Sequence, residues 1–162
     1  MKKNHAILLI FLVIITLTGI SCATSQKNGN NEEAKLLLKE LIDKGEYSIE
    51  ATMAYPRRGK SISLTSSYSL KIKNDSVFSY LPFYGRAYNI PYGGGNGLNF
   101  TAPVENYLVK YNKKGDATIN FNAKTSEDTY KYTINIYPNG SSNIDVIMQQ
   151  RESMRYSGRL DQ

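Results

Sequence analysis

The sequence predicts a mainly β domain: an antiparallel meander of about eight strands that forms a curved sheet or a barrel, with one N-terminal α-helix packed on it. From residue 47 onward, apolar and polar residues alternate in several short runs, which is typical of strands with one wet face. Sequences typical of tight turns separate these runs. Tyrosine, which strands favour, occurs 13 times, whereas tryptophan is absent.

One helix is predicted before the strands. Asn30 is its expected N-cap, with Glu33 three residues later as in a capping box. Lys44 and Gly45 supply a basic end and a C′ glycine. An apolar stripe runs along the helix at Ala34, Leu37, Leu38, Leu41 and Ile42. We expect this stripe to pack on the sheet; a helix that binds a partner is the alternative.

The expected strands cover residues 47–55, 62–72, 77–81, 98–102, 107–111, 117–123, 130–136 and 144–148. The expected turns include Asn74-Asp75, Lys114-Gly115, Ser126-Glu127-Asp128 and Pro138-Asn139-Gly140. In the first strand, one face is predicted to carry Tyr47, Ile49, Ala51, Met53 and Tyr55. A twisted sheet of this size tends to curl into a barrel or to fold onto itself.

The first 21 residues are predicted to be an export signal. Lys2 and Lys3 precede an apolar run of about a dozen residues, which is shorter than the ~20 residues of a membrane-spanning helix. Small residues follow, and Cys22 comes directly after Gly19-Ile20-Ser21. This placement resembles the lipobox of bacterial lipoproteins, although Gly19 stands where leucine is usual.

The resemblance to a lipobox implies cleavage before Cys22 and lipidation of that residue with diacylglycerol and a fatty acid such as palmitate. Several acyl chains anchor a protein stably, whereas one is marginal. The expected organisation is a signal peptide over residues 1–21, a flexible tether over 22–31 and one β-rich domain over 32–162. Ala23 is not an aspartate retention signal, so the outer membrane, on its periplasmic face, is the expected location. A soluble secreted protein with an incidental cysteine is the alternative.

Histidine and cysteine usage narrows the chemistry. The only histidine is His5 and the only cysteine is Cys22, so the mature domain lacks Ser–His–Asp and Cys–His catalysis, zinc sites of those ligands and an internal disulfide. No cofactor and no metal are expected. Loss of Lys2 and Lys3 lowers the basic count from 20 to 18 against 14 acidic residues, a net charge of +4. The sequence has no dense stripe of lysine and arginine that would predict nucleic-acid binding.

The segment 80–100 interrupts the meander and is the candidate binding loop. Tyrosines recur every four residues, but Pro82, Gly85 and Pro91 argue against a helix. Tyrosine rings beside arginine suit stacking on a sugar or an aromatic ligand. The alternative is that the tyrosines only cover the barrel mouth. The candidate residues for a ligand or partner are Tyr80, Tyr84, Arg86, Tyr88, Tyr92, Gly93, Gly94 and Gly95.

Arg151 and Tyr156 are the candidate structural clamp near the end of a last strand. Arg151 is expected to pair with a carboxylate such as Glu105 or Asp128. A role in holding a ligand is the alternative.

Several of these segments resemble one uncharacterised lipoprotein family, domain of unknown function 4251. The resemblance rests on residues 80–88, 91–95 and 97–100, on Ile62-Ser63-Leu64-Thr65, Asn74-Asp75-Ser76-Val77 and Glu127-Asp128-Thr129-Tyr130, and on Arg151 with Tyr156-Ser157-Gly158. It covers nearly all of the mature domain. It implies a small envelope lipoprotein and brings no known activity, substrate or catalytic residue.

Three functions follow as hypotheses. The first is a non-enzymatic binding or structural lipoprotein whose lipocalin-like barrel holds a small apolar or glycan ligand, which predicts an enclosed cavity. The second is a protein-interaction module, an accessory subunit or inhibitor, which predicts a filled interior and exposed aromatic residues. The third, the least favoured, is a hydrolase using carboxylates such as Glu105, Glu127 and Asp128, which predicts their convergence in one cleft.

Overall fold

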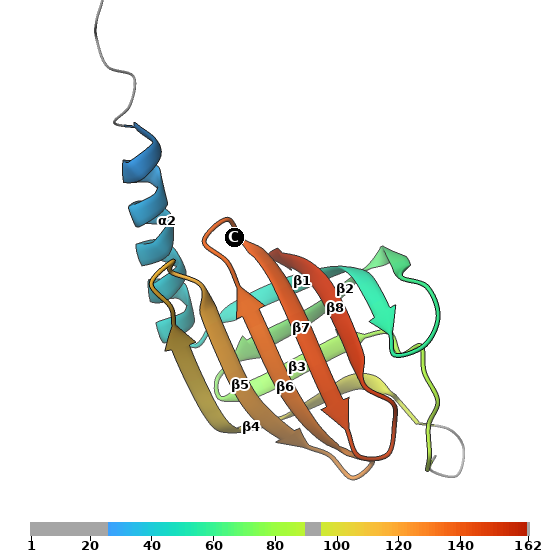
Figure 1. The fold of residues 1–162 in the computed structure, drawn as a ribbon. Helices are drawn as coiled ribbons and strands as arrows, with labels where there is room; N and C mark the ends of the chain where they lie inside the picture. Colours follow the sequence, from blue (N-terminus) through green and yellow to red (C-terminus); the bar gives the residue numbers. More distant parts are fainter. Residues whose placement is uncertain (1–25, 90–94, 162) are drawn as a thin grey trace, which may run out of the picture. The chain divides into compact units, whose positions relative to one another are not determined.

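Eight antiparallel strands close into a barrel in the computed structural model of the chain (Figure 1). Each strand pairs with the next along the sequence, and the first pairs with the last. This confirms the predicted mainly β meander and resolves it as a closed barrel. The elements are α2 (Gln26–Asp43), β1 (Tyr47–Pro56), β2 (Ile62–Lys73), β3 (Ser76–Leu81), β4 (Leu98–Tyr111), β5 (Ala117–Lys124), β6 (Thr129–Ile136), β7 (Ser141–Met148) and β8 (Met154–Leu160).

The structure describes residues 26–89 and 95–161, and side chains only from residue 32 onward. The predicted signal peptide, Cys22, Tyr92, Gly93 and Gly94 lie outside the described residues. Within the described ranges, no helix has the length and apolar character needed to cross a membrane.

Successive turns of an up-and-down meander alternate between opposite ends of the barrel, so each end carries its own set of connections. The helix end carries the turns 74–75, 112–116 and 137–140, together with α2, whose Asp43 accepts a hydrogen bond of 2.8 Å from the Tyr111 hydroxyl. The loop end carries the turns 57–61, 125–128 and 149–153 and the connection 82–97 (Figure 1).

Side chains fill the interior of the barrel. Tyr130, Tyr132 and Tyr156 are at most 1% exposed, and the Phe121 and Tyr132 rings stack with centroids 4.9 Å apart. The Tyr132 hydroxyl donates to Oγ of Ser79, itself buried, at 3.3 Å. Burial raises the pKa of both the Tyr132 and the Tyr156 phenols, because a phenolate would lose its hydration there.

Helix α2 closes the helix end with part of its apolar stripe. Leu38 and Ile42 are buried in the core, whereas Leu37 is 60% exposed. Gly45 ends the helix with φ +67° and donates from its N–H to the Ile42 carbonyl at 2.9 Å, as a C′ glycine does.

The start of α2 differs from the prediction. The helix begins at Gln26 and not after Asn30, so residues 26–31, which we expected in the flexible tether, are helical. Glycine and asparagine weaken a helix without ending it, and no proline lies between Cys22 and Asp43, so nothing obliges the helix to begin at Asn30.

Three strand details also differ from the predictions. The expected strands 98–102 and 107–111 are one strand, β4, which is irregular between Glu105 and Leu108. The expected set ended at residue 148 and did not include β8. In β1, a bulge between Ala51 and Met53 shifts the buried parity, so that Ala54 is buried while Tyr55 is exposed.

Candidate binding site at the loop end

The connection after β3 is held by backbone pairing rather than by helical structure. The Glu152 N–H donates to the Arg86 carbonyl at 2.9 Å, and the Tyr88 N–H donates to the Gln150 carbonyl at 2.7 Å. The Glu152 carboxylate in turn accepts a hydrogen bond from the Arg86 N–H at 3.1 Å. Tyr156 is buried in the core, and its hydroxyl donates a hydrogen bond to the Pro82 carbonyl at 2.7 Å. Residues 82–89 therefore form an ordered arm against the β7–β8 turn.

Arg151 is a buried cation at the base of this arm. Its side chain is 3% exposed, and it donates from Nη2 to Oε2 of Glu127 at 2.9 Å and from Nη1 to Oδ2 of Asp128 at 3.4 Å. Asp128 is fully buried and also accepts from the backbone N–H groups of Gln149 and Gln150, at 2.9 and 3.1 Å. Arg151 thus pairs with Asp128, one of its two expected partners, and also with Glu127, which was not predicted as a partner.

Glu105, the other expected partner, is exposed on β4, and no ion pair found within the described ranges includes it. The carboxylates of Glu127 and Asp128 lie side by side, but both face Arg151. In residues 26–89 and 95–161, no group of three or more histidine, cysteine, aspartate or glutamate side chains is placed to hold a metal ion.

The far end of the connection is tied to the same ion pair. The Asn96 N–H donates to Oε1 of Glu127 at 3.3 Å, and the Tyr130 hydroxyl donates to the Gly97 carbonyl at 3.1 Å. A Cβ atom on Gly95 would lie 2.6 Å from Oε2 of Glu127 and 2.7 Å from Nη2 of Arg151. Only glycine lets the backbone approach the ion pair this closely.

Between these two anchored segments lies a groove of about 560 Å³, open to solvent. Its lining includes Tyr68, Tyr80, Pro82, Phe83, Gly95, Asn96, Asn99 and Arg151. The Tyr68 and Tyr80 rings lie with centroids 5.4 Å apart, so the two form one aromatic wall. Tyr68 was not among the predicted site residues, because its place in a predicted strand gave no sign that it would face this groove.

The structure brings only some of the predicted loop residues together. Tyr80 and Gly95 line the groove with Arg151. Tyr84, Arg86 and Tyr88 lie outside it, exposed on the arm, with Tyr88 62% and Tyr84 38% exposed. Tyr156 lies in the core, and its hydroxyl donates a hydrogen bond to the arm.

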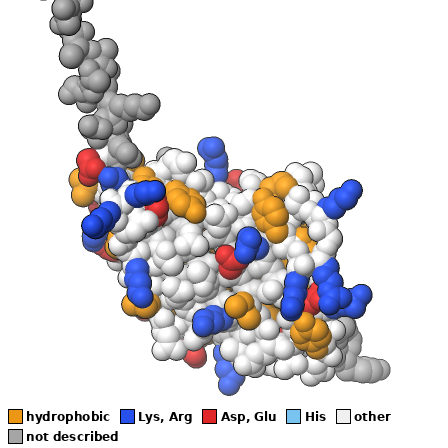
Figure 2. Space-filling model, viewed as in Figure 1, with side chains coloured by type: hydrophobic (Ala, Val, Ile, Leu, Met, Phe, Trp, Pro, Cys, Tyr) orange, Lys and Arg blue, Asp and Glu red, His pale blue; other side chains and the backbone are white. Residues whose placement is uncertain are grey.

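The loop end is basic as well as rich in tyrosine. Arg57, Arg58 and Lys60 are exposed in the β1–β2 turn, and Arg86 is exposed on the arm. From residue 51 to residue 104 the only acidic residue is Asp75, which lies in a turn at the helix end. On the face seen in Figure 2, several Lys and Arg side chains lie at the right of the molecule, with an acidic side chain among them.

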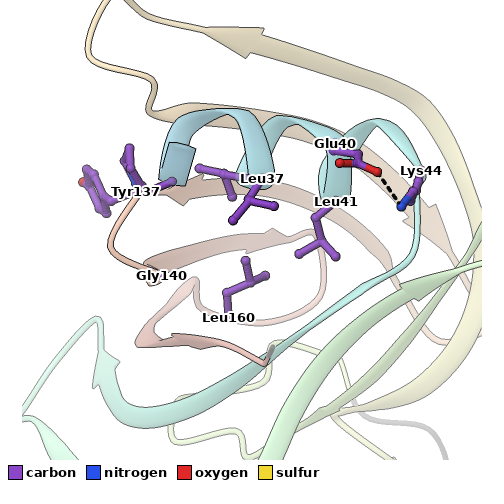
Figure 3. A pocket seen from close by; sticks show the side chains of 10 residues that line it. Leu37, Glu40, Leu41, Lys44, Tyr137, Gly140 and Leu160 are labelled. Atoms are coloured by element: carbon purple, nitrogen blue, oxygen red, sulfur yellow. Dashed lines mark ion pairs between the residues drawn. The ribbon is translucent and has the colours of Figure 1, made fainter. Parts of the chain in front are cut away.

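A second hollow, of about 470 Å³, lies at the helix end between α2 and the β6–β7 turn. Leu37 and Leu41 of α2 and Leu160 of β8 point into it, and Tyr137 lines it (Figure 3). At its rim, Lys44 pairs with Glu40 at 2.8 Å. This cleft is apolar, and it lies at the opposite end of the barrel from the tyrosine-lined groove.

Comparison with known proteins agrees with this fold. The sequence model of the family described as "Domain of unknown function (DUF4251)" matches residues 28–160. The crystal structure of a DUF4251 family protein from Bacteroides eggerthii DSM 20697 is similar, with a TM-score of 0.60 and 15% sequence identity over 82% of this chain and 89% of that one. At this identity the similarity supports the fold and not a function. A comparison with curated proteins finds no match. Since the family match spans most of the chain, this chain belongs to the DUF4251 family.

Proposed function

We propose that the protein is a non-enzymatic envelope lipoprotein that binds an acidic partner protein through its loop end. One observation carries the proposal: buried side chains fill the barrel, while Tyr80, Tyr84 and Tyr88 stand 38 to 62% exposed at one end. A binding function inside the barrel would require space that Tyr130, Tyr132 and Tyr156 occupy. Binding is therefore assigned to the outer surface, where tyrosine and arginine are favoured interface anchors.

Charge indicates the kind of partner. Arg57, Arg58, Lys60 and Arg86 are exposed at the loop end, and Arg58 pairs with Glu152, Nε to Oε1 at 3.6 Å. Glu127 and Asp128, in the β5–β6 turn, pair with Arg151, so Arg57, Lys60 and Arg86 carry the basic character of this surface. A basic surface attracts an acidic partner and suppresses basic ones.

The position of the predicted lipid anchor also favours binding at the loop end. Cys22, the predicted lipidation site, precedes the first residue of α2 by four positions, and the chain enters the barrel at its helix end. Acylation of Cys22 would hold the helix end towards the lipid and leave the loop end for partners. We place the protein in the outer membrane, facing the periplasm.

Capture from the native envelope tests the proposal. Full-length lipidated protein is cross-linked in cells and purified in three forms: wild type, a Tyr84→Ala/Arg86→Ala/Tyr88→Ala variant, and an Ile147→Ala control. Ile147 is 58% exposed on β7, so it matches Tyr88 in exposure but lies on the barrel wall. We expect one discrete protein to be captured by the wild type and the control and to be lost from the triple variant. Equal capture by all three would refute a binding role for the arm.

A glycan ligand is the second candidate, favoured by the groove. Its aromatic wall of Tyr68 and Tyr80 faces a lining that includes the amide side chains of Asn96 and Asn99, and aromatic rings with planar polar groups suit sugar rings. Native mass spectrometry of protein purified from its own envelope distinguishes the candidates. A bound saccharide lost on Tyr80→Ala substitution would favour the glycan.

A further inference from the structure

Strand β2 runs past the end of its neighbour β3. The two strands pair from Ser69 with Tyr80 to Lys73 with Ser76, and β3 ends at Leu81. Residues 62–68 of β2 therefore have no partner strand on their β3 side within the described part of the chain. The arm that follows β3 pairs instead with the β7–β8 turn.

The other side of this stretch is only partly paired. Tyr68 pairs with Ala51 of β1, but the next pair is Ser63 with Met53, so that residues 64–67 face Thr52 alone across a bulge. No turn, loop or side-chain hydrogen bond found in residues 26–89 and 95–161 involves residues 61–68. On the side that faces away from β1, the backbone N–H and C=O groups of residues 62–68 therefore have no partner strand within the described ranges and can accept an added one.

This edge lacks the usual protection. Natural proteins blunt free edges with charged residues, prolines or a covering segment. Residues 61–70 contain no charged residue and no proline, and Ser63, Thr65, Ser66 and Ser67 are exposed.

Residues 105–111 of β4 also run past the end of β3, and side chains of α2 and β1 contact this stretch. Asp43 of α2 accepts a hydrogen bond from the Tyr111 hydroxyl at 2.8 Å, and the Tyr107 hydroxyl lies 3.1 Å from that of Tyr47. In the described ranges no such side-chain hydrogen bond from a neighbouring element is found at residues 62–67, so the β2 edge is the more accessible of the two.

We propose that residues 62–68 accept an extended acidic segment of the partner as an added β-strand. The inference rests on the proposed function and names the form of its partner. Main-chain hydrogen bonds to a free edge supply affinity, and neighbouring side chains supply selectivity. The exposed Arg57 and Lys60 immediately precede this edge and favour an acidic strand over a basic one, whereas Arg58 between them pairs with Glu152.

The test uses the full mature chain and a short synthetic peptide of alternating glutamate and valine. Two control peptides carry lysine in place of glutamate, or N-methyl groups on all backbone nitrogens, which block strand pairing along both edges of the peptide. We expect the first peptide to slow amide hydrogen exchange at residues 62–68 and the control peptides to leave it unchanged. If the N-methylated peptide slows exchange at residues 62–68 as much as the first peptide does, the proposal is wrong. This comparison needs no variant of the protein.

A matched pair of variants tests the edge itself. Ser66 lies in the stretch that has no Cα partner on β1 or β3, so Ser66→Pro removes a backbone donor there without touching a registered pair of the β1 ladder, and Ser66→Ala is its control. We expect Ser66→Pro to weaken peptide binding about fivefold or more and Ser66→Ala to leave it within about twofold. Circular dichroism and unfolding midpoints check that both variants fold.

The same pair separates this inference from the proposed function. If Ser66→Pro retains the native partner while the Tyr84/Arg86/Tyr88 variant loses it, strand addition is wrong and the interaction module stands. If neither variant loses the partner, both proposals fail. If the wild type self-associates and Ser66→Pro is monomeric, a second copy occupies the edge, which also contradicts the proposal.

Discussion

Arg151 and Asp128 form a buried ion pair, with Nη1 of the arginine 3.4 Å from Oδ2 of the aspartate and side chains that are 3% and 0% exposed. The pair joins the β7–β8 turn to the β5–β6 turn. Through Glu127, which accepts from Arg151 and from the Asn96 N–H, it also fixes the end of the connection that precedes β4. The charged cluster therefore ties three segments of the loop end together.

Removal of the cation is the first prediction. Arg151→Ala would leave Asp128 buried without its counter-charge, and breaking one side of a buried pair costs roughly 3–5 kcal/mol. The backbone N–H groups that still donate to Asp128 place the expected loss at the lower end of that range. Glu127→Gln, which keeps an acceptor, is expected to lose about 1 kcal/mol. Urea unfolding measures both, and equal losses would contradict this account of the cluster.

Closure of the barrel depends on Gly158, which gives the second prediction. A Cβ atom at this position would lie 1.9 Å from the Glu50 carbonyl oxygen, a backbone atom that cannot move aside without distorting the β1–β8 pairing. We expect Gly158→Ala to lower the free energy of unfolding by about 3 kcal/mol or to prevent folding. Gly85→Ala is the control, since its Cβ would meet the flexible Phe83 ring. A stable Gly158→Ala protein with an unchanged midpoint would refute tight closure here.

Burial of tyrosine in the core predicts alkaline instability. Burial holds the pKa of Tyr132 and Tyr156 above that of an unfolded tyrosine, so their contribution to stability is complete below about pH 10 and is lost as the pH rises above it. Each group can lower the unfolding free energy by up to about 1.4 kcal/mol per pH unit. Urea unfolding at several values between pH 8 and pH 11, around the pKa of ~10 of free tyrosine, measures how steeply the unfolding free energy falls with pH. Tyr132→Phe should make the slope shallower; an unchanged slope would contradict the assignment.

The docking of α2 gives a further prediction. Ile42 is 1% exposed in the core, whereas Leu37 is 60% exposed on the same helix. Ile42→Ala is expected to cost about 2–4 kcal/mol and Leu37→Ala about 0.5 kcal/mol or less. Thermal and urea unfolding measure the difference. Similar losses from both variants would mean that Leu37 is covered in the folded protein in solution.

Period-two alternation predicted most strands because one face of each is buried. It also located the turn at Asn74 and Asp75, which adopt φ values of 50° and 53° as a tight hairpin turn requires. It failed where the backbone departs from regular pairing. The bulge in β1 moves Ala54 inward, and the irregularity near Asn106, whose φ is +55°, divides the pattern of β4 into two apparent strands.

The candidate site was only partly predictable. The choice of segment followed from its tyrosines and glycines, and Asp128 as a partner for Arg151 followed from charge. The groove itself depends on contacts between positions far apart in sequence, such as Tyr68 with Tyr80 and Gly95 with Glu127, and no local pattern carries them. The four-residue spacing of the tyrosines was not informative, because the arm is extended and only Tyr80 of the described ones lines the groove.

The central claim is that partners meet the loop end, away from the lipid anchor. Site-specific photo-cross-linking in living cells tests it most directly, with the cross-linking amino acid in place of Tyr88 in one strain and of Leu37 in another. The two positions are matched, at 62% and 60% exposure, and lie at opposite ends of the barrel. We predict a discrete protein adduct from position 88 and none from position 37. The same adduct from position 37, or its absence at position 88 in a protein that is lipidated and folded, would contradict the account.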